Sequence, residues 1–252
     1  MEYLFLLTVF LFGTAVGSFL NVIIHRLQCQ ESFVRGRSHC PRCRHVLAWY
    51  DLVPVVSFFL LGRRCRHCQA RISWQYPAVE LATGILFAFG LYFVHGFWPL
   101  LIYFAAVTFF TALWVYDATT YLVPDQISLP AIVVIAALNL FSGASAAMLA
   151  VGAVLGGVWF LLQFVISRGR WVGGGDVRLG VLVGALLGYP GIIIGLAFAY
   201  LGGSLIAAVL LLLGRKRFGS RLPFATILLP AALAAWLWGA DIWQWYLTAL
   251  GF

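Results

Sequence analysis

The chain has 252 residues, of which 63% are hydrophobic and only 10% are charged, and its mean hydropathy is +0.98. Soluble domains are normally about half apolar and about a quarter charged, and no apolar run here carries the polar stripe that a soluble helix bundle needs. These properties exclude an ordinary water-soluble protein. The net charge of +8 is confined to a few loops, so we expect no nucleic-acid partner.

Apolar runs long enough to cross a hydrocarbon layer of about 30 Å recur along the chain. They predict an all-α polytopic membrane protein with about eight transmembrane helices embedded in the lipid bilayer. The first run has no basic segment before it and no cleavage motif after it, so we expect a retained helix rather than a secretory signal. In chain order the runs cover residues 3–24, 77–94, 97–116, 127–141, 146–166, 177–188, 191–213 and 222–239.

The distribution of basic residues predicts the orientation in the membrane. Nine arginines lie between Arg26 and Arg71, three lie between Arg168 and Arg178, and four basic residues lie in the segment 215–221. With eight spans, these three segments fall on one side of the membrane, and the positive-inside rule makes that side cytosolic. Both termini then face outward, and the basic loops attract anionic lipid.

Two C-x₂-C pairs, Cys40-Pro-Arg-Cys43 and Cys65-Arg-His-Cys68, are separated by 21 residues in the polar segment after the first run. Four thiolates presented by two such turns are typical of a tetrahedral zinc site. Two disulfides are the alternative, but disulfides are rare in the cytosol. We predict structural zinc, which would stabilise a loop too small to form a core of its own.

The sequence accordingly divides into a first transmembrane helix (1–25), a cytosolic four-cysteine metal-binding loop (26–76) and a transmembrane domain (77–252). Within the loop, Cys29 is expected to be a free thiol that is buried or at an interface. Three histidines flank the cysteine pairs and could replace a ligand, but we expect them to be solvated: His39, His45 and His67.

Most of the eight acids have an ordinary interpretation. Glu80 is placed in the first turn of the second span, where the helix dipole favours a negative charge. Asp125 follows Pro124 and is interpreted as a helix N-cap. Both are retained as accessory candidates. Four acids are expected to be solvated in loops or at the termini: Glu2, Glu31, Asp51 and Asp241.

Asp117 and Asp176 differ from the other acids because each adjoins a long apolar run, at the predicted cytosolic end. Ionisable groups so close to hydrocarbon are costly and usually functional. Two carboxylates at the same depth can form an aspartic peptidase site, in which an ionised carboxylate deprotonates water and its protonated partner polarises the scissile carbonyl. Two such carboxyl groups share one proton. Asp117 is placed at a helix C-terminus, where the helix dipole disfavours a negative charge, and Asp176 at an N-terminus, where it favours one. We therefore predict that Asp117 holds the shared proton.

Three glycines, Gly173, Gly174 and Gly175, precede Asp176. Glycine allows positive φ and close approach of another backbone, so an extended substrate could lie beside this carboxylate. The alternative is a proton-relay acid of a multi-pass transporter or channel whose zinc loop is structural. A transporter needs a polar path through the membrane, and no predicted span carries a charge near its middle.

Four motifs in order resemble the bacterial type IV prepilin peptidase family over nearly the whole chain. They are Gly17-Ser18-Phe19-Leu20-Asn21-Val22; the two cysteine pairs followed by residues 72–77 and 79–81; Asp117 with Pro124-Asp125; and Gly173-Gly174-Gly175-Asp176, which is similar to a G-x-G-D motif shared with presenilin-like proteases. Arg178 stands where a lysine is usual, and the segment 27–39 is shorter than in many members. The cysteine loop distinguishes the chain from archaeal preflagellin peptidases.

The resemblance implies an aspartic endopeptidase of the bacterial inner membrane, with Asp117 and Asp176 as catalytic residues. Its substrates would be type IV prepilins or the pseudopilins of type II secretion, cleaved at the cytosolic face after a glycine. Many members also methylate the new N-terminal residue with S-adenosylmethionine, although no glycine-rich cofactor motif appears here. The native substrates, the oligomeric state and the methyltransferase residues are not indicated by the sequence.

Overall fold

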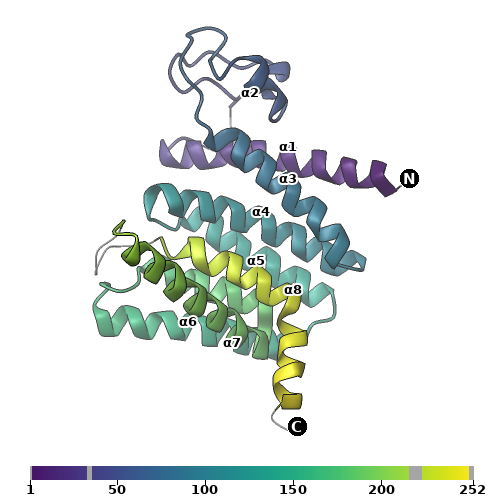
Figure 1. Ribbon diagram of the computed structural model, residues 1–252, viewed down its shortest axis with the longest axis vertical. Coiled ribbons are helices and arrows are strands. Elements are labelled where there is room, and N and C mark those ends of the chain that lie inside the picture. The colour runs from purple at the N-terminus through teal and green to yellow at the C-terminus, as the bar shows by residue number, and fades with distance from the viewer. Residues whose placement is uncertain (1, 33–35, 216–222, 250–252) are drawn as a thin grey trace. The chain divides into compact units, whose positions relative to one another are not determined.

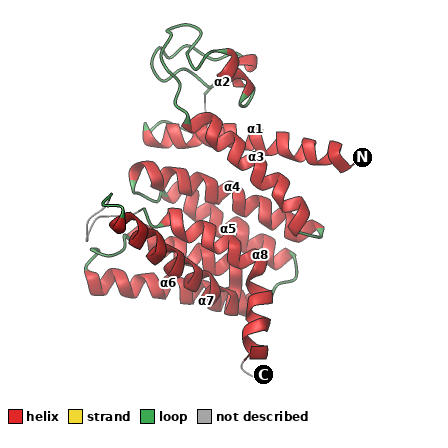
Figure 2. Ribbon diagram, viewed as in Figure 1, coloured by secondary structure: helices red, strands yellow, loops and turns green. Residues whose placement is uncertain are grey.

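The computed structural model describes residues 2–32, 36–215 and 223–249. The chain forms two compact units, Met1–His95 and Gly96–Phe252, which are described separately. The first unit contains α3 (Gln75–Phe93), the helix of the second predicted span, whereas the division drawn from the sequence set its last boundary between residues 76 and 77. In the described part of the chain, regular structure is helical, apart from two isolated β-bridges in the cysteine loop (Figure 2).

The N-terminal unit is built on two long apolar helices, α1 (Glu2–Gln28) and α3 (Gln75–Phe93), which cross each other (Figure 1). Glycines bring their backbones together: a Cβ added at Gly17 would lie 2.8 Å from Cα of Glu80, and one at Gly13 would lie 2.9 Å from Cα of Gly84. The segment between the helices contains the short 3₁₀ helix η1 (Trp49–Leu52) and α2 (Val56–Leu60).

The described residues of the C-terminal unit form the helices α4 (Phe97–Thr120), α5 (Asp125–Phe141), α6 (Ala146–Ser167), α7 (Gly174–Leu212) and α8 (Ala225–Ala249). Helices α6 and α8 pack on α7, and α4 packs on α5 and α8. All-helical architecture is confirmed. Part of the third basic segment, together with the first residue of the last predicted run, lies outside the described residues.

The predicted runs 177–188 and 191–213 form the two parts of α7, which are separated by non-helical backbone at Gly188 (φ 60°) and Tyr189 (ψ 136°). The second part runs back along α6, because a Cβ added at Gly156 would lie 2.2 Å from the carbonyl oxygen of Gly180 in the first part and 3.3 Å from Ile192 in the second. Pro190 has no amide hydrogen and disfavours a helical conformation in the residue before it, which accounts for the break. Among the described residues, six helices are long and apolar enough to cross a membrane, while α5, with 17 residues, is shorter.

Helices α6 and α7 pack through glycines at four-residue spacing. A Cβ at Gly156 would lie 2.2 Å from the carbonyl oxygen of Gly180, and one at Gly184 would lie 2.1 Å from that of Gly152. Between apolar helices in lipid, close van der Waals packing of small residues replaces the hydrophobic effect as the source of association. The contact holds the N-terminal half of α7, which begins two residues before Asp176, against α6.

Gly156→Ala is therefore expected to lower the thermal stability of the purified protein in detergent. The added methyl group meets backbone on α7, which cannot move away as a flexible side chain would, and overpacking of this kind typically costs about 1–3 kcal/mol. The matched control is Gly202→Ala, also within α7, where an added Cβ meets nothing within 4 Å. An unchanged melting temperature in Gly156→Ala would contradict the packing argument.

Candidate active site and metal centre

Asp117 lies in the last turn of α4 and is buried, with 5% of its surface exposed. Its Oδ2 accepts a hydrogen bond of 3.0 Å from the backbone N–H of Ala225, the first residue of α8. The sequence indicated only that Asp117 lies at a helix C-terminus, where the helix dipole disfavours a negatively charged carboxylate. The structure shows that the N-terminus of α8 also lies beside Asp117, and the free N–H groups there favour the charged carboxylate. No sequence argument identified this contact, although Pro223 just before α8 is typical of a helix start.

Asp176 is the third residue of α7, and its Oδ2 accepts the N–H of Gly173 at 2.7 Å. The carboxylate thereby satisfies one of the unpaired donors at this helix N-terminus. Asp176 also lies close enough to Asp117 for their charges to interact. The C-terminus of α4 and the N-termini of α7 and α8 thus meet at one end of this unit, with two carboxylates among them.

The three glycines before Asp176 do not use the positive φ that glycine allows. None of them is among the residues with positive φ, and Gly173 has φ −83°. Gly175 is required for space, because a Cβ there would lie 2.7 Å from Cβ of Val123 in the loop after α4. At Gly174 an added Cβ would meet nothing within 4 Å. The approach of a substrate backbone to these glycines stays a prediction.

Asp125 is not the N-cap that the sequence predicted. Pro124 occupies the N-cap position of α5 without a side-chain capping hydrogen bond, and Asp125 is the first helical residue. Its carboxylate instead forms an ion pair with Arg178, two residues after Asp176. Arg178 was noted in the sequence only for its charge, because its partner lies in a different helix. The pair connects the starts of α5 and α7 beside the two aspartates.

The four predicted metal ligands, Cys40, Cys43, Cys65 and Cys68, form one cluster, with their sulfur atoms within 4.8 Å of one another. The sulfurs of Cys40 and Cys68 are 3.8 Å apart. A tetrahedral zinc ion with Zn–S bonds of about 2.3 Å separates its ligands by about 3.8 Å. The donor set and its spacing therefore fit zinc, and with four protein ligands the site is closed, as in structural rather than catalytic sites.

The two cysteine pairs adopt the same turn, a repetition that the sequence analysis did not notice. In each turn the first cysteine donates its N–H to a carbonyl five residues later and accepts an N–H from the residue four later. The bonds are Cys40 N–H to His45 O (2.9 Å), Arg44 N–H to Cys40 O (2.9 Å), Cys65 N–H to Ala70 O (2.9 Å) and Gln69 N–H to Cys65 O (3.0 Å). Within each turn, these backbone hydrogen bonds position the two cysteines of the pair.

The surroundings of the cysteine cluster shift the pKa values of Cys40 and Cys43 in opposite directions. Burial disfavours the Cys40 thiolate, but hydrogen bonds from the backbone at Cys43 and Arg42 and from neighbouring thiols lower the pKa of Cys40 to about 7. The backbone at His45 favours the Cys43 thiolate, but desolvation and three neighbouring sulfurs outweigh it and raise the pKa of Cys43 to about 11. Four adjacent thiolates repel one another, so a bound cation is what would allow all four to ionise.

Two expectations for the N-terminal unit were wrong. Glu80 lies in the second turn of α3, not the first, because the helix begins at Gln75, and Glu80 is 7% exposed. The Asp51 side chain is 4% exposed and forms an ion pair of 2.9 Å with Arg66, so it is not solvated. Local sequence does not reveal this pair, because the two residues are 15 positions apart. Cys29, expected to be buried or at an interface, is exposed in this chain.

Comparison with known proteins gives two family matches. Residues 11–94 match the bacterial peptidase A24 N-terminal domain, and residues 104–213 match the type IV leader peptidase family. These ranges fall within the two structural units. No solved structure matches the chain significantly.

Similar proteins include three named "Prepilin leader peptidase/N-methyltransferase". The one from Bacillus subtilis (strain 168) is 33% identical, over 96% of this chain and 98% of the relative. The one from Aeromonas salmonicida (strain A449) is 31% identical, over 99% and 96%. The one from Myxococcus xanthus (strain DK1622) is 36% identical over 86% of this chain, which spans 66% of that relative. The resemblance drawn from four short motifs is confirmed, and the chain belongs to the type IV leader peptidase family.

Proposed function

We propose that this protein is a membrane aspartic endopeptidase that removes the leader from type IV prepilins or pseudopilins. The observation that carries the proposal is that the helix ends bearing Asp117 and Asp176 come together at one end of the C-terminal unit, where Gly175 contacts Val123 in the loop after α4. Membership of the type IV leader peptidase family and the names of its relatives support the choice of substrate. No finding supports the transporter or channel alternative.

The chemistry follows from two neighbouring carboxyl groups that share one proton. The ionised carboxylate takes a proton from water, whose oxygen attacks the scissile carbonyl carbon. The protonated partner donates a hydrogen bond to the carbonyl oxygen as negative charge develops there. The C–N bond then breaks, and the leaving amine receives the proton taken from water. The open space at Gly174 would admit an extended substrate next to Asp176.

The relatives' names also support a second activity, methylation of the new N-terminus. S-adenosylmethionine, when bound, would supply an electrophilic methyl group to the amine nitrogen that cleavage releases. In this proposal the basic loops place both reactions on the cytosolic side of the inner membrane.

The test uses purified full-length protein in detergent with a synthetic prepilin, with and without S-adenosylmethionine. Mass spectrometry should show loss of the leader in both samples and a further gain of one methyl group only in the sample with S-adenosylmethionine. Adding a chelator during the first minutes should leave cleavage unchanged, because the cysteine cluster is structural in this proposal. An intact prepilin after prolonged incubation with folded protein would refute the peptidase.

A further inference from the structure

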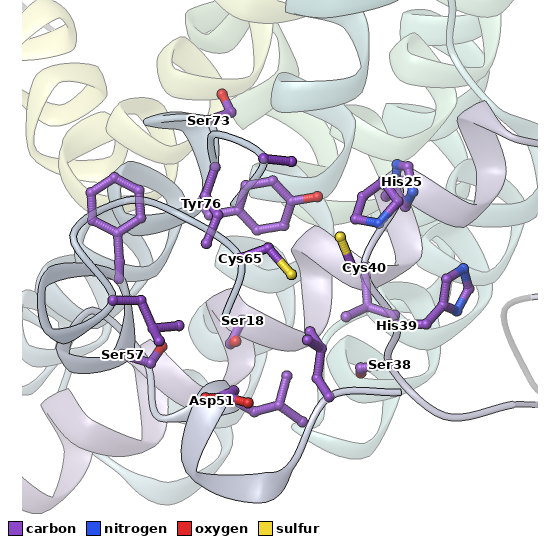
Figure 3. Close-up of a pocket in the computed structure, with 18 of the residues that line it drawn as sticks. Ser18, His25, Ser38, His39, Cys40, Asp51, Ser57, Cys65, Ser73 and Tyr76 are labelled. Atoms are coloured by element: carbon purple, nitrogen blue, oxygen red, sulfur yellow. The ribbon is translucent and has the colours of Figure 1, made fainter. Parts of the chain in front are cut away.

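Helix α2 has one face toward the interior of the N-terminal unit and an apolar face toward the outside. Ser57 and Phe58 line a cavity of about 360 Å³ between the cysteine loop, α1 and α3 (Figure 3). Val56, Phe59 and Leu60 do not belong to that lining, and they are 51%, 58% and 82% exposed. Their i, i+3, i+4 spacing puts these three side chains on one face of the helix.

Trp74 connects this face to the start of a membrane span. It is the N-cap residue of α3, a helix long and apolar enough to cross a membrane, and it is exposed. The centroid of its ring lies 6.2 Å from that of Phe59 and 5.0 Å from that of Phe58. Tryptophan is enriched at the level of lipid headgroups. Val56, Phe59, Leu60 and Trp74 together form an exposed apolar surface, the α2 patch, beside the point where α3 would enter the membrane.

Three arginines border the α2 patch around a hollow of about 210 Å³, which is lined by Gly62, Arg63, Arg64 and Arg71. Arg63 connects the hollow to the patch, since its guanidinium carbon lies 4.7 Å from the centre of the Trp74 ring. Arg64 and Arg71 are paired in an antiparallel β-bridge. Like charges at directly opposed positions repel each other, so an anion between these two side chains would stabilise the bridge.

The arginines of the hollow form no ion pairs with acids of the protein. Among the residues that the structure describes, none of the ion pairs includes Arg63, Arg64 or Arg71. Asp51, an acid of the same loop, is already paired with Arg66. Guanidinium groups bind phosphate through two parallel N–H···O bonds. Three of them around one hollow are therefore suited to a phosphate group.

We propose that the α2 patch docks on the lipid surface where α3 enters the membrane, and that the hollow holds the phosphate of an anionic phospholipid headgroup. A segment with an apolar face bordered by basic residues is typical of proteins that lie in the membrane interface. Basic residues next to a membrane span add attraction to anionic lipid. One bilayer surface supplies both the apolar layer and the phosphates. Docking holds the cysteine loop against the membrane and does not depend on the proposed cleavage.

Calorimetry on the full-length protein in detergent tests the phosphate site. Short-chain phosphatidylglycerol, which is anionic, should bind more tightly than short-chain phosphatidylcholine, which has no net charge. Arg64→Gln and Arg71→Gln should each weaken binding of phosphatidylglycerol about fivefold, the contribution of one arginine at an anionic surface. Arg44→Gln is the charge-matched control, because Arg44 is exposed in the same loop but lies outside the hollow. Inorganic phosphate that binds as tightly as phosphatidylglycerol, or unchanged binding in both arginine variants, would refute the lipid site.

Trypsin digestion of the full-length protein in lipid nanodiscs tests the docking of the patch. Trypsin cleaves after accessible arginines, so cleavage after Arg63 and Arg64 should be severalfold slower in phosphatidylglycerol than in phosphatidylcholine. Cleavage after Arg44 in the same samples should change much less. Leu60→Ser removes an apolar side chain of the patch and should restore cleavage in phosphatidylglycerol, whereas Val46→Ser, at an exposed residue outside the patch, should not. Melting temperatures establish that each variant is folded. Equal cleavage of the wild-type protein after Arg63 and Arg64 in the two lipids would overturn the docking.

Discussion

Asp117→Asn and Asp176→Asn are each expected to lower the rate of leader cleavage by at least about a hundredfold, since a positioned general acid or base contributes about 10²–10⁴-fold. Asparagine can neither take a proton from water nor give one to the leaving group. It does keep a side-chain oxygen that can accept the N–H of Ala225 or Gly173, so the fold should be retained. Initial rates on a synthetic prepilin, with melting temperature measured in parallel, provide the comparison.

Asp125→Asn is the matched control, since it removes a nearby carboxylate outside the proposed dyad. Its ion pair with Arg178 is partly exposed, with 58% of the Asp125 side chain accessible, and exposed pairs are worth only about 0–1 kcal/mol. We expect less than a tenfold loss of rate. Near-normal cleavage by either dyad variant would refute the mechanism, and a larger loss in Asp125→Asn than in Asp117→Asn would mean that the first catalytic aspartate had been misassigned.

Cys65→Ser is expected to remove the bound zinc and to unfold the cysteine loop. Cys65 is 5% exposed and lies in one of the two matching turns, so its loss leaves three thiolates and an incomplete tetrahedral site. Structural zinc contributes apparent binding free energies of about 10–16 kcal/mol in zinc-finger peptides, far more than a segment of this size can gain from its own core. Metal content by mass spectrometry and limited proteolysis of the loop measure both consequences.

Cys29→Ser is the control for this experiment, because Cys29 is an exposed thiol outside the cluster. It should keep one zinc per chain and the wild-type proteolysis pattern. Acid should release the metal from the wild-type protein, because protons compete with the cation for the thiolates. One equivalent of zinc retained after substitution of all four cysteines would refute the site.

Helical structure was predictable along the chain because it depends on local composition. Apolar runs with few charges can satisfy their backbone groups in lipid only as helices, so each run predicts its own element. The course of α7 was less predictable. Gly188 and Pro190 indicate a break in the sequence whether the chain reverses direction there or continues after a kink. The packing distinguishes the two, because Ile192 and Tyr200 of the second part lie along α6 in the direction opposite to that of the first part.

The cysteine cluster was predictable for a related reason, since each C-x₂-C pair brings two thiols together within a single turn and only the meeting of the two turns is tertiary. The environment of Glu80 was not predictable. Its position in α3 could be read approximately, but the hydrogen bond from Val55 and the surrounding cavity depend on how the loop folds back on α1 and α3. The charge of a side chain can be read from the residue itself, whereas the group that pairs with it generally depends on the tertiary fold.

By itself, the sequence determined that this is a helical membrane protein with two conspicuous carboxylates and four thiolates, because hydrophobic length, charge and ligand chemistry are properties of short segments. Only the tertiary structure decided which groups surround those carboxylates. Asp117 receives an N–H from α8, more than 100 residues away in the chain, and Asp125 pairs with Arg178 rather than capping its own helix. Such contacts arise from the packing of whole helices, whose apolar surfaces look alike in sequence, so no local pattern indicates which helix ends will meet.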